Sequence, residues 1–239
     1  MKQSRACVLG ASGGIGAALV DRLAEAGYEK VYAGTRVPRG GAAPNVLPFR
    51  FDLLDESSLA EAADRIAADG PLHLVVVATG MLHSEGIGPE KSARQIDAAA
   101  MTEVFAVNTI GPALAAKYFL PLLARDRRAV IAFLSARVGS IGDNRLGGWH
   151  SYRASKAALN ALVRCFAIEL ASRNPKAIAV ALHPGTVDTP LSKPFQRNVP
   201  AGRLFAPEDS ARHLLAVIER LTPAESGGLF AWDGSPIEY

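Results

Sequence analysis

Tyr152 and Lys156 are the two residues of this chain whose types and spacing best suit acid–base chemistry. If their segment is helical, one turn separates them, so both side chains lie on the same face. A lysine ammonium near a phenol stabilises the phenolate and lowers the tyrosine pKa from its reference value of about 10. Such a tyrosine can donate a proton to a carbonyl oxygen while hydride reaches the carbon, or accept one in reverse. A half-exposed tyrosine beside a solvated lysine is the alternative interpretation.

A glycine-rich turn near the start of the chain is typical of a nucleotide-binding site. Residues 10–16, Gly-Ala-Ser-Gly-Gly-Ile-Gly, lie between an apolar run and an amphipathic stretch. Glycine permits a tight turn and lets a pyrophosphate approach the amides at a helix N-terminus. The turn alone is weak evidence, but its position between a strand and a helix strengthens the prediction. The residues expected to bind a cofactor here are Gly10, Ser12, Gly13, Gly14, Ile15 and Gly16.

The end of the second apolar run favours NADP(H) over NAD(H). In sites that prefer NAD(H), an acidic residue about 20 positions beyond the glycines holds the ribose 2′-hydroxyl. Thr35 and Arg36 occupy that place here. A carboxylate would repel a 2′-phosphate, whereas a guanidinium can pair with it through two hydrogen bonds. We therefore expect Thr35 and Arg36 to contact NADP(H); a solvated loop arginine is the alternative.

The elements that must position these residues alternate along the chain. Apolar runs predict strands over residues 6–10, 31–34, 46–51, 72–78, 129–135, 178–182 and 229–232. Apolar residues at helical spacing predict helices over 15–26, 56–68 (with Asp55 as a possible N-cap), 101–124, 152–173 and 208–220. Continuous apolar strands separated by helices indicate an α/β fold, a single Rossmann-type doubly wound parallel sheet of about seven strands with helices on both faces. Ligands of such sheets bind beyond the carboxyl ends of the strands.

The chain is expected to form one dinucleotide-binding domain over residues 1–239. Two loops interrupt the pattern, a turn-rich one at 38–44 and a longer one at 184–204 that contains four prolines. Neither has the character of a domain linker. A loop as long as the second is usually a functional flap or a disordered segment. We expect its part near residues 186–205 to be a substrate loop, with Trp149 and His150 shaping the same pocket.

Composition argues against several other classes of protein. The net charge is only +3, and Lys and Arg are scattered, which disfavours a nucleic-acid partner. The two cysteines are read as buried hydrophobes, and the five histidines lack metal-ligand spacing, so no metal is expected. No signal peptide and no apolar stretch near the ~20 residues of a membrane span are apparent, which predicts a cytoplasmic protein. The helices over 101–124 and 152–173 carry apolar residues on more than one face, which predicts a homodimer or homotetramer.

Taken together, the glycine turn and the Tyr-x-x-x-Lys pair resemble the short-chain dehydrogenase/reductase family over nearly the whole chain. The stretches Leu-Ser-Ala-Arg-Val-Gly-Ser (134–140) and Asn-Arg-Leu-Gly-Gly-Trp (144–149) resemble its branch of C-factor-like proteins and small carbonyl reductases. The resemblance implies that Ser135 hydrogen-bonds the substrate oxygen and that Asn108 holds a water linking Lys156 to solvent. It also implies that Lys156 grips the cofactor ribose. The remaining cofactor contacts that it implies are Asp52, Leu53, Ala78, Thr79, Gly80, Pro184, Gly185, Val187 and Thr189.

The chain departs from the family pattern in three places. The usual Asn-Asn-Ala-Gly after the fourth strand is Val-Ala-Thr-Gly here, residues 77–80. The family often has two serines after the fifth strand, the second being catalytic, and Ala136 fills that second place. Ser135 also lies farther before Tyr152 than is commonest, which makes Ser140 a rival. We favour Ser135 because it directly ends the strand.

These observations favour an NADP(H)-dependent oxidoreductase that transfers hydride between nicotinamide and a small-molecule carbonyl or alcohol substrate. Tyr152 would be the proton carrier, Ser135 would polarise the oxygen, and Lys156 would tune the tyrosine. One alternative is an NADP(H)-binding regulatory protein of the same fold with little or no turnover, for which the C-factor-like resemblance and Ala136 speak. Another is a methyltransferase with a glycine-rich loop, which would not explain Tyr152, Lys156 or Arg36.

Overall fold

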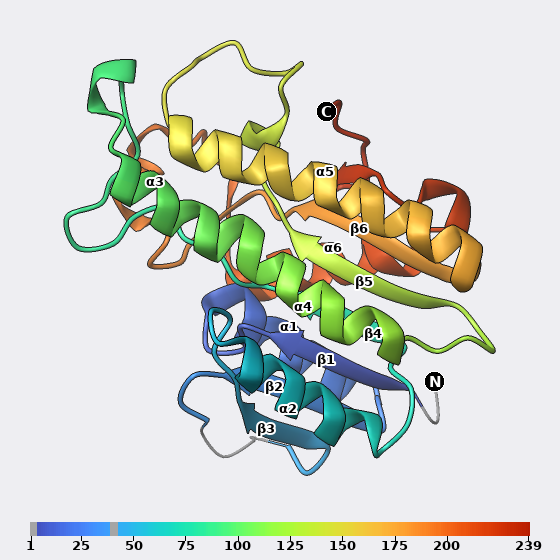
Figure 1. The fold of residues 1–239 in the computed structure, drawn as a ribbon. Helices are drawn as coiled ribbons and strands as arrows, with labels where there is room; N and C mark the ends of the chain where they lie inside the picture. Colours follow the sequence, from blue (N-terminus) through green and yellow to red (C-terminus); the bar gives the residue numbers. More distant parts are fainter. Residues whose placement is uncertain (1–3, 39–42) are drawn as a thin grey trace.

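A twisted sheet of seven strands, in which each neighbouring pair is parallel, forms the centre of the molecule (Figure 1). The computed structural model describes residues 4–38 and 43–239, so the predicted loop at 38–44 lies partly outside the described residues. The strand order is β3-β2-β1-β4-β5-β6-β9, which confirms the doubly wound α/β sheet predicted from the sequence. Its strands are β1 (Arg5–Leu9), β2 (Lys30–Thr35), β3 (Val46–Arg50), β4 (Leu74–Val77), β5 (Ala129–Leu134), β6 (Ala177–His183) and β9 (Leu229–Ala231).

Helices cover both faces of this sheet, because successive side chains of a buried strand point to opposite faces and both must be kept from water. Along β1, for example, Cys7 and Leu9 belong to one apolar cluster and Ala6 and Val8 to the other. The first cluster is covered by α2 (Glu56–Ala67), α4 (Gly111–Phe119) and α5 (His150–Arg173), and the second by α1 (Gly14–Glu25) and α6 (Pro207–Arg220).

The long helix predicted over residues 101–124 is interrupted. It consists of α3 (Ala98–Phe105), a π-helical turn η2 (Ala106–Ile110) and α4, followed by a short 3-10 turn η3 (Leu120–Leu122). The π turn contains Asn108, whose amide is bonded to groups outside its own helix. Insertions of this kind frequently mark functional sites. The apolar spacing predicted one continuous helix here and did not detect the turn.

The stretch Ala98–Leu122 also corrects one expectation. By length and composition it is long and apolar enough to cross a membrane, although the sequence analysis found no apolar stretch near that length. In the structure α3 packs against α5, and α4 packs against α2 and β4. Core helices of globular proteins pass the same test, so the feature is weak evidence about a membrane.

The segments that follow the carboxyl ends of the strands gather at one edge of the sheet. The predicted helix over 56–68 begins as expected, since Asp55 Oδ1 accepts hydrogen bonds from the amides of Ser57 and Ser58.

The predicted loop over 184–204 has more structure than the sequence indicated. Its two ends pair as a small parallel ribbon of β7 (Thr186–Val187) and β8 (Leu204–Phe205).

Candidate active site

The glycine-rich turn brings the backbone of β1, α1 and the loop after β6 into close approach. Gly10 has a φ of +98°, a conformation that favours glycine, and its amide donates to the carbonyl of Gly34 at 3.0 Å. Gly16 lies directly on the Gly10 carbonyl, leaving no room for a side chain. A Cβ at Gly14 would lie 2.8 Å from Cγ2 of Thr189. The turn and the Thr189 segment therefore face each other, as two walls of one site would.

The N-terminus of α1 is open to an anion. Its N-cap residue is Gly13, and the described chain supplies neither a capping side chain nor an acidic residue in the first turn. The first amides of a helix lack intrahelical acceptors and carry the positive end of the helix dipole. A phosphate group fits this position without competition from a carboxylate.

Two threonines at the same edge of the sheet have buried hydroxyls without a hydrogen-bond partner. They are Thr35 at the end of β2 and Thr79 after β4, and neither Oγ1 finds a partner in the described part of the chain. Buried hydroxyls are ordinarily paired, so both point to a ligand that supplies the missing groups. Arg36 follows Thr35 and is exposed, free to reach a phosphate. A dinucleotide thus fits the residues present.

The other cofactor residues implied by the resemblance lie at the carboxyl ends of β3, β4 and β6. Asp52 accepts the amide of Leu54 at 3.0 Å, and the buried Leu53 lies against Gly111 of α4. Ala78 continues the pairing of β4 with β1 through the carbonyl of Leu9. The structure therefore collects the predicted cofactor residues at one edge of the sheet, while their contact with a cofactor stays a prediction.

Tyr152 and Lys156 lie on α5 with both side chains buried, at 9% and 2% exposure. The lysine Nζ donates to the carbonyl of Leu134 at 2.8 Å and lies 5.9 Å from the centre of the tyrosine ring. Burial raises the pKa of Tyr152 to about 12 and lowers the pKa of Lys156 to about 8. The direction for Tyr152 is opposite to the one predicted from the sequence. The cause is desolvation, because burial penalises the charged phenolate.

Asn108 links the segment after β4 to α5, the helix that carries Tyr152 and Lys156. Its Oδ1 accepts from the amide of Met81, and its Nδ2 donates to the Met81 carbonyl, both at 2.8 Å. Nδ2 also donates to Oγ of Ser155 on α5 at 3.1 Å. A Cβ at Gly80 would lie 3.5 Å from Lys156 Nζ and 3.6 Å from Asn108 Oδ1. The two polar atoms therefore border the same space beside Gly80, where the predicted water would have to lie.

The geometry does not favour the direct substrate contact predicted for Ser135. Its hydroxyl is buried and donates to Oδ1 of Asn160 on α5 at 2.7 Å, although the residue borders the cavity described below. The side chain that packs with Tyr152 is the methyl group of Ala136. The rival Ser140 accepts the amide of Asp143 at 3.0 Å and does not border that cavity. Side chains alternate between opposite directions at the end of an extended strand. The adjacent residues Ser135 and Ala136 therefore point to different sides, and Ala136 is the one that faces the tyrosine.

A largely apolar cavity of about 350 Å³ lies in front of Tyr152. The rings of Trp149 and Phe195 meet edge to face at 5.2 Å, and Trp149 lies 6.2 Å from the ring of Tyr152. The predicted residue His150 is not among the lining residues. Residues of the glycine turn, of the segment after β5 and of the loop after β6 complete the wall, among them Ile15, Ser135, Pro184, Gly185, Val187 and Thr189.

Part of the predicted substrate loop closes over this cavity. The short helix η5 (Lys193–Asn198) carries Phe195, and Leu191 and Val199 on either side of it also line the cavity. Across the opening, His83 Nε2 lies 3.2 Å from the carbonyl of Pro190 and its ring packs against Phe195. Leu191 and Phe195 lie within the predicted substrate loop. The sequence analysis did not assign Leu82 and Val138 to the cavity, because these residues follow β4 and β5 outside any periodic pattern.

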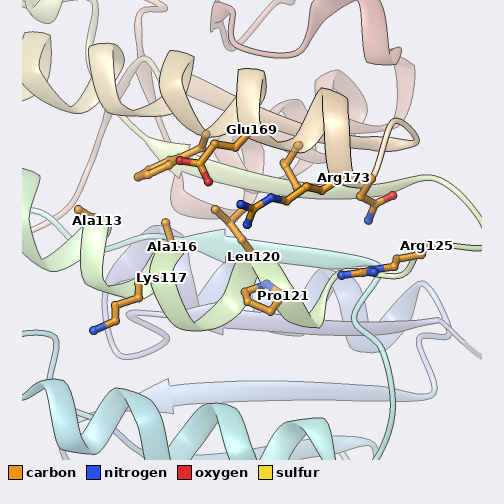
Figure 2. A pocket seen from close by; sticks show the side chains of 11 residues that line it. Ala113, Ala116, Lys117, Leu120, Pro121, Arg125, Glu169 and Arg173 are labelled. Atoms are coloured by element: carbon orange, nitrogen blue, oxygen red, sulfur yellow. The ribbon is translucent and has the colours of Figure 1, made fainter.

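A second hollow, of about 440 Å³, lies between α4 and α5 (Figure 2). Figure 2 shows Glu169 and Arg173 of α5 facing Lys117, Leu120 and Pro121 across it. This hollow shares no residue with the cavity at Tyr152. It lies on the outer surface of the helical layer and has no part in the chemistry considered above.

Comparison with known proteins identifies the family. The short chain dehydrogenase family matches residues 4–200, and the chain belongs to it. An uncharacterized oxidoreductase of Schizosaccharomyces pombe is 29% identical over 97% of this chain and 96% of its own. The C-signal protein of Myxococcus xanthus is 35% identical over 60% of this chain and 81% of its own.

Among solved structures, an NADPH-bound carbonyl reductase from chicken fatty liver is similar with a TM-score of 0.84. It is 27% identical to this chain, and the match covers 99% of this chain and 95% of that one. These comparisons confirm the family predicted from the sequence. They also confirm the resemblance to C-factor-like proteins, through the C-signal protein, and to carbonyl reductases. The chain is an oxidoreductase of the short-chain dehydrogenase/reductase family.

Proposed function

We propose that this protein reduces a carbonyl compound, or oxidises the corresponding alcohol, with NADP(H) as cofactor and Tyr152 as the proton carrier. The observation that carries the proposal is the place of the Tyr152 phenol. Tyr152 borders an apolar cavity that is also lined by Ile15, in the first turn of α1, and by Thr189, which lies against Gly14 of the same turn. A cofactor held at that N-terminus and a substrate in the cavity would be neighbours.

The cofactor would be held by backbone and side chains from several strand ends. The amides after Gly13 suit a pyrophosphate, and the unpaired hydroxyls of Thr35 and Thr79 suit polar groups of the dinucleotide. Arg36 would pair with the 2′-phosphate, which supports NADP(H) over NAD(H). When bound, NADPH supplies the hydride, and the protein contributes orientation and electrostatics.

Tyr152 suits the role of an acid in the reductive direction. Because burial holds its pKa near 12, the phenol stays protonated at neutral pH and keeps a proton available for a developing alkoxide. Lys156, with a pKa near 8, titrates close to neutral pH and so can exchange protons with solvent. The space beside Gly80, bordered by Asn108 Oδ1 and Lys156 Nζ, is where a water would relay that proton.

Ser135 is better assigned to positioning than to substrate contact. Its hydrogen bond to Asn160 joins the end of β5 to α5, the helix that carries Tyr152. Ala136 faces the tyrosine and has no hydrogen-bond donor in its side chain. The Tyr152 phenol would therefore be the hydrogen-bond donor that polarises the substrate oxygen. We therefore expect Ser135→Ala to lower turnover through the position of α5, and Ser140→Ala to have little effect.

The lining of the cavity supports a small apolar substrate. Trp149, Phe195, Leu191 and Val138 are among its apolar lining residues, and burying apolar groups against them is favourable. The loop that carries Phe195 would shield the reacting carbon from water once substrate is bound.

A spectrophotometric screen tests this proposal. Apolar aldehydes and ketones are offered to the purified protein with NADPH or NADH, and loss of absorbance at the reduced-nicotinamide band is followed. Turnover with NADPH, and weaker turnover with NADH, is the expected result. Tight NADPH binding without turnover across a broad panel would contradict the proposal and favour the regulatory alternative.

A further inference from the structure

Glu90 is a buried carboxylate that the family pattern does not assign to any role here. It lies in the irregular segment between β4 and α3 and is 7% exposed. Both carboxylate oxygens accept from the amide of Ser151, at 3.3 and 3.2 Å, and the Ser151 hydroxyl donates to Oε1. The backbone carbonyl of Glu90 accepts from the amide of Trp149. Glu90 therefore accepts hydrogen bonds from the residue before α5, Trp149, and from the second residue of α5, Ser151.

The start of α5 depends on this contact because its own sequence provides no cap. Its N-cap residue is Trp149, which has a left-handed φ of 52° and, in the chain as described, makes no capping side-chain bond. The first turn of α5 contains no acidic residue. Helix N-termini need acceptors for their free amides and are stabilised by negative charge. Glu90 supplies both from a distant part of the chain.

The carboxylate is well suited to stay charged in this position. Burial opposes its ionisation, but the hydrogen bonds from Ser151 outweigh that effect, so the pKa of Glu90 lies below its usual value. His150, at the start of the same helix, also lowers the pKa of Glu90. A buried carboxylate without such partners would be strongly destabilised.

The contact is adjacent to the reacting group. Ser151 precedes Tyr152, and Glu90, Ser151 and Tyr152 border one small cavity with Leu82. Leu82 also lines the cavity in front of the tyrosine. Displacement of the first turn of α5 would therefore move the phenol relative to the substrate cavity.

We propose that Glu90 is a positioning residue, which caps α5 through Ser151 and thereby sets the position of the Tyr152 phenol for proton transfer. The inference rests on the proposed function for its catalytic part. It needs no contact between Glu90 and substrate. Catalysis is sensitive to small displacements, since a shift of about 1 Å in a reacting group can cost on the order of 100-fold in rate.

Glu90→Gln keeps the shape of the side chain and removes its charge, so it is the main test. We expect kcat for carbonyl reduction to fall about 10-fold or more, while NADPH affinity stays at the wild-type value. Ser151→Ala should lower kcat in the same direction. Glu85→Gln, in the same segment but exposed, is the matched control and should behave as the wild type.

The Tyr152→Phe background separates positioning of the phenol from a general structural effect. If Glu90 acts through Tyr152, adding Glu90→Gln to Tyr152→Phe should cause no further loss of the residual turnover. An unchanged kcat in Glu90→Gln alone, or an equal loss in both backgrounds, would overturn the inference.

Amide hydrogen exchange provides a readout that does not depend on turnover. Glu90→Gln should speed exchange in residues 150–153 and leave the C-terminal half of α5 unchanged. If the wild-type protein reduces no carbonyl compound, the proposed function fails, and exchange still decides whether Glu90 holds the helix. Unchanged exchange at 150–153 would overturn the capping role itself.

Discussion

Burial acts on the charged forms of Tyr152 and Lys156 in the candidate active site. It keeps the Tyr152 phenol neutral and weakens the hold of Lys156 on its proton, giving a tyrosine pKa near 12 and a lysine pKa near 8. The group that changes protonation nearest to neutral pH is therefore the lysine. Acid–base catalysis at neutral pH needs one such group in reach of the reacting atoms or of a proton relay.

The buried lysine should leave a signature in the pH dependence of stability. Its pKa is about 8 in the folded protein and 10.5 as the reference value, so between these values the unfolded chain binds more protons. The free energy of unfolding attributable to Lys156 should therefore rise with pH across this window, by on the order of 1–3 kcal/mol. Urea unfolding of wild type and Lys156→Met at pH 7.5 and 9.5 measures the effect. If the two proteins differ in unfolding free energy by the same amount at both pH values, the burial assigned to Lys156 is contradicted.

Arg36 should determine cofactor preference. Arg36→Asp replaces an ion pair with the 2′-phosphate by repulsion, so NADPH should bind on the order of 10- to 100-fold more weakly, while NADH binding should hold or improve. Fluorescence titration of both cofactors measures the change. Arg65→Asp, which changes an exposed arginine of α2 away from the cavity, is a control for net charge. Equal or tighter NADH binding by the wild type would contradict the assignment.

At the scale of elements, the cavity proposed for the substrate is lined by segments that follow the carboxyl ends of the strands. Phe195 is carried by η5, whose loop is anchored at both ends by the β7–β8 ribbon. Behind the ribbon, Phe205 packs edge to face on Trp232 at 4.7 Å. The loop is thus held at its base and able to vary at its tip, which suits a lid.

Phe195 should contribute to substrate binding more than to chemistry. Phe195→Ala removes one apolar wall of the cavity, and we expect KM for a bulky apolar carbonyl compound to rise about 10-fold with little change in NADPH affinity. Arg197 is exposed on the same short helix, and Arg197→Ala should change neither the KM for this compound nor the NADPH affinity. Steady-state kinetics with two substrates of different size checks this, and an unchanged KM for the larger one would place the substrate elsewhere.

Elements with strong periodicity could be predicted from the sequence, whereas contacts between loops could not. The strands of the sheet are largely apolar because both faces are covered by helices, and the capping role of Asp55 follows from local chemistry. The contacts of Asn108 in the π turn could not be predicted, because its partner Met81 is distant in sequence. Glu90 was missed for the same reason, since its partner Ser151 lies 61 residues away.

The serine next to the fifth strand shows the limit within the site itself. Adjacent residues of an extended chain face opposite sides, so the choice among Ser135, Ala136 and Ser140 depends on register. Sequence reasoning used distance from the strand end and favoured Ser135. The structure places the side chain of Ala136 against Tyr152 and that of Ser135 against Asn160.

At the scale of the whole molecule, the outer surface of α4 and α5 suits association with a second copy. The hollow between the two helices combines apolar surface with Glu169, Arg173 and Arg125 (Figure 2). On the adjoining surface of α5, Ile168 is 61% exposed. In a two-fold contact, acidic and basic groups of one copy can face their counterparts in the other.

We therefore expect at least a dimer in solution, and Ile168→Glu should weaken it. Leu146→Glu, which changes an exposed leucine outside these helices, is the matched control and should leave assembly unchanged. Light scattering at micromolar concentration measures the mass of each protein. A monomeric wild type would contradict this expectation.

The central claim, that Tyr152 carries the proton, is tested most directly by the rate of carbonyl reduction in Tyr152→Phe. The substitution removes one hydroxyl and keeps the ring, so folding and NADPH binding should match the wild type. With a substrate found by the screen, NADPH oxidation should slow by the ~100- to 10,000-fold typical of a lost acid or base. Turnover at a rate near that of the wild type would contradict the mechanism proposed here.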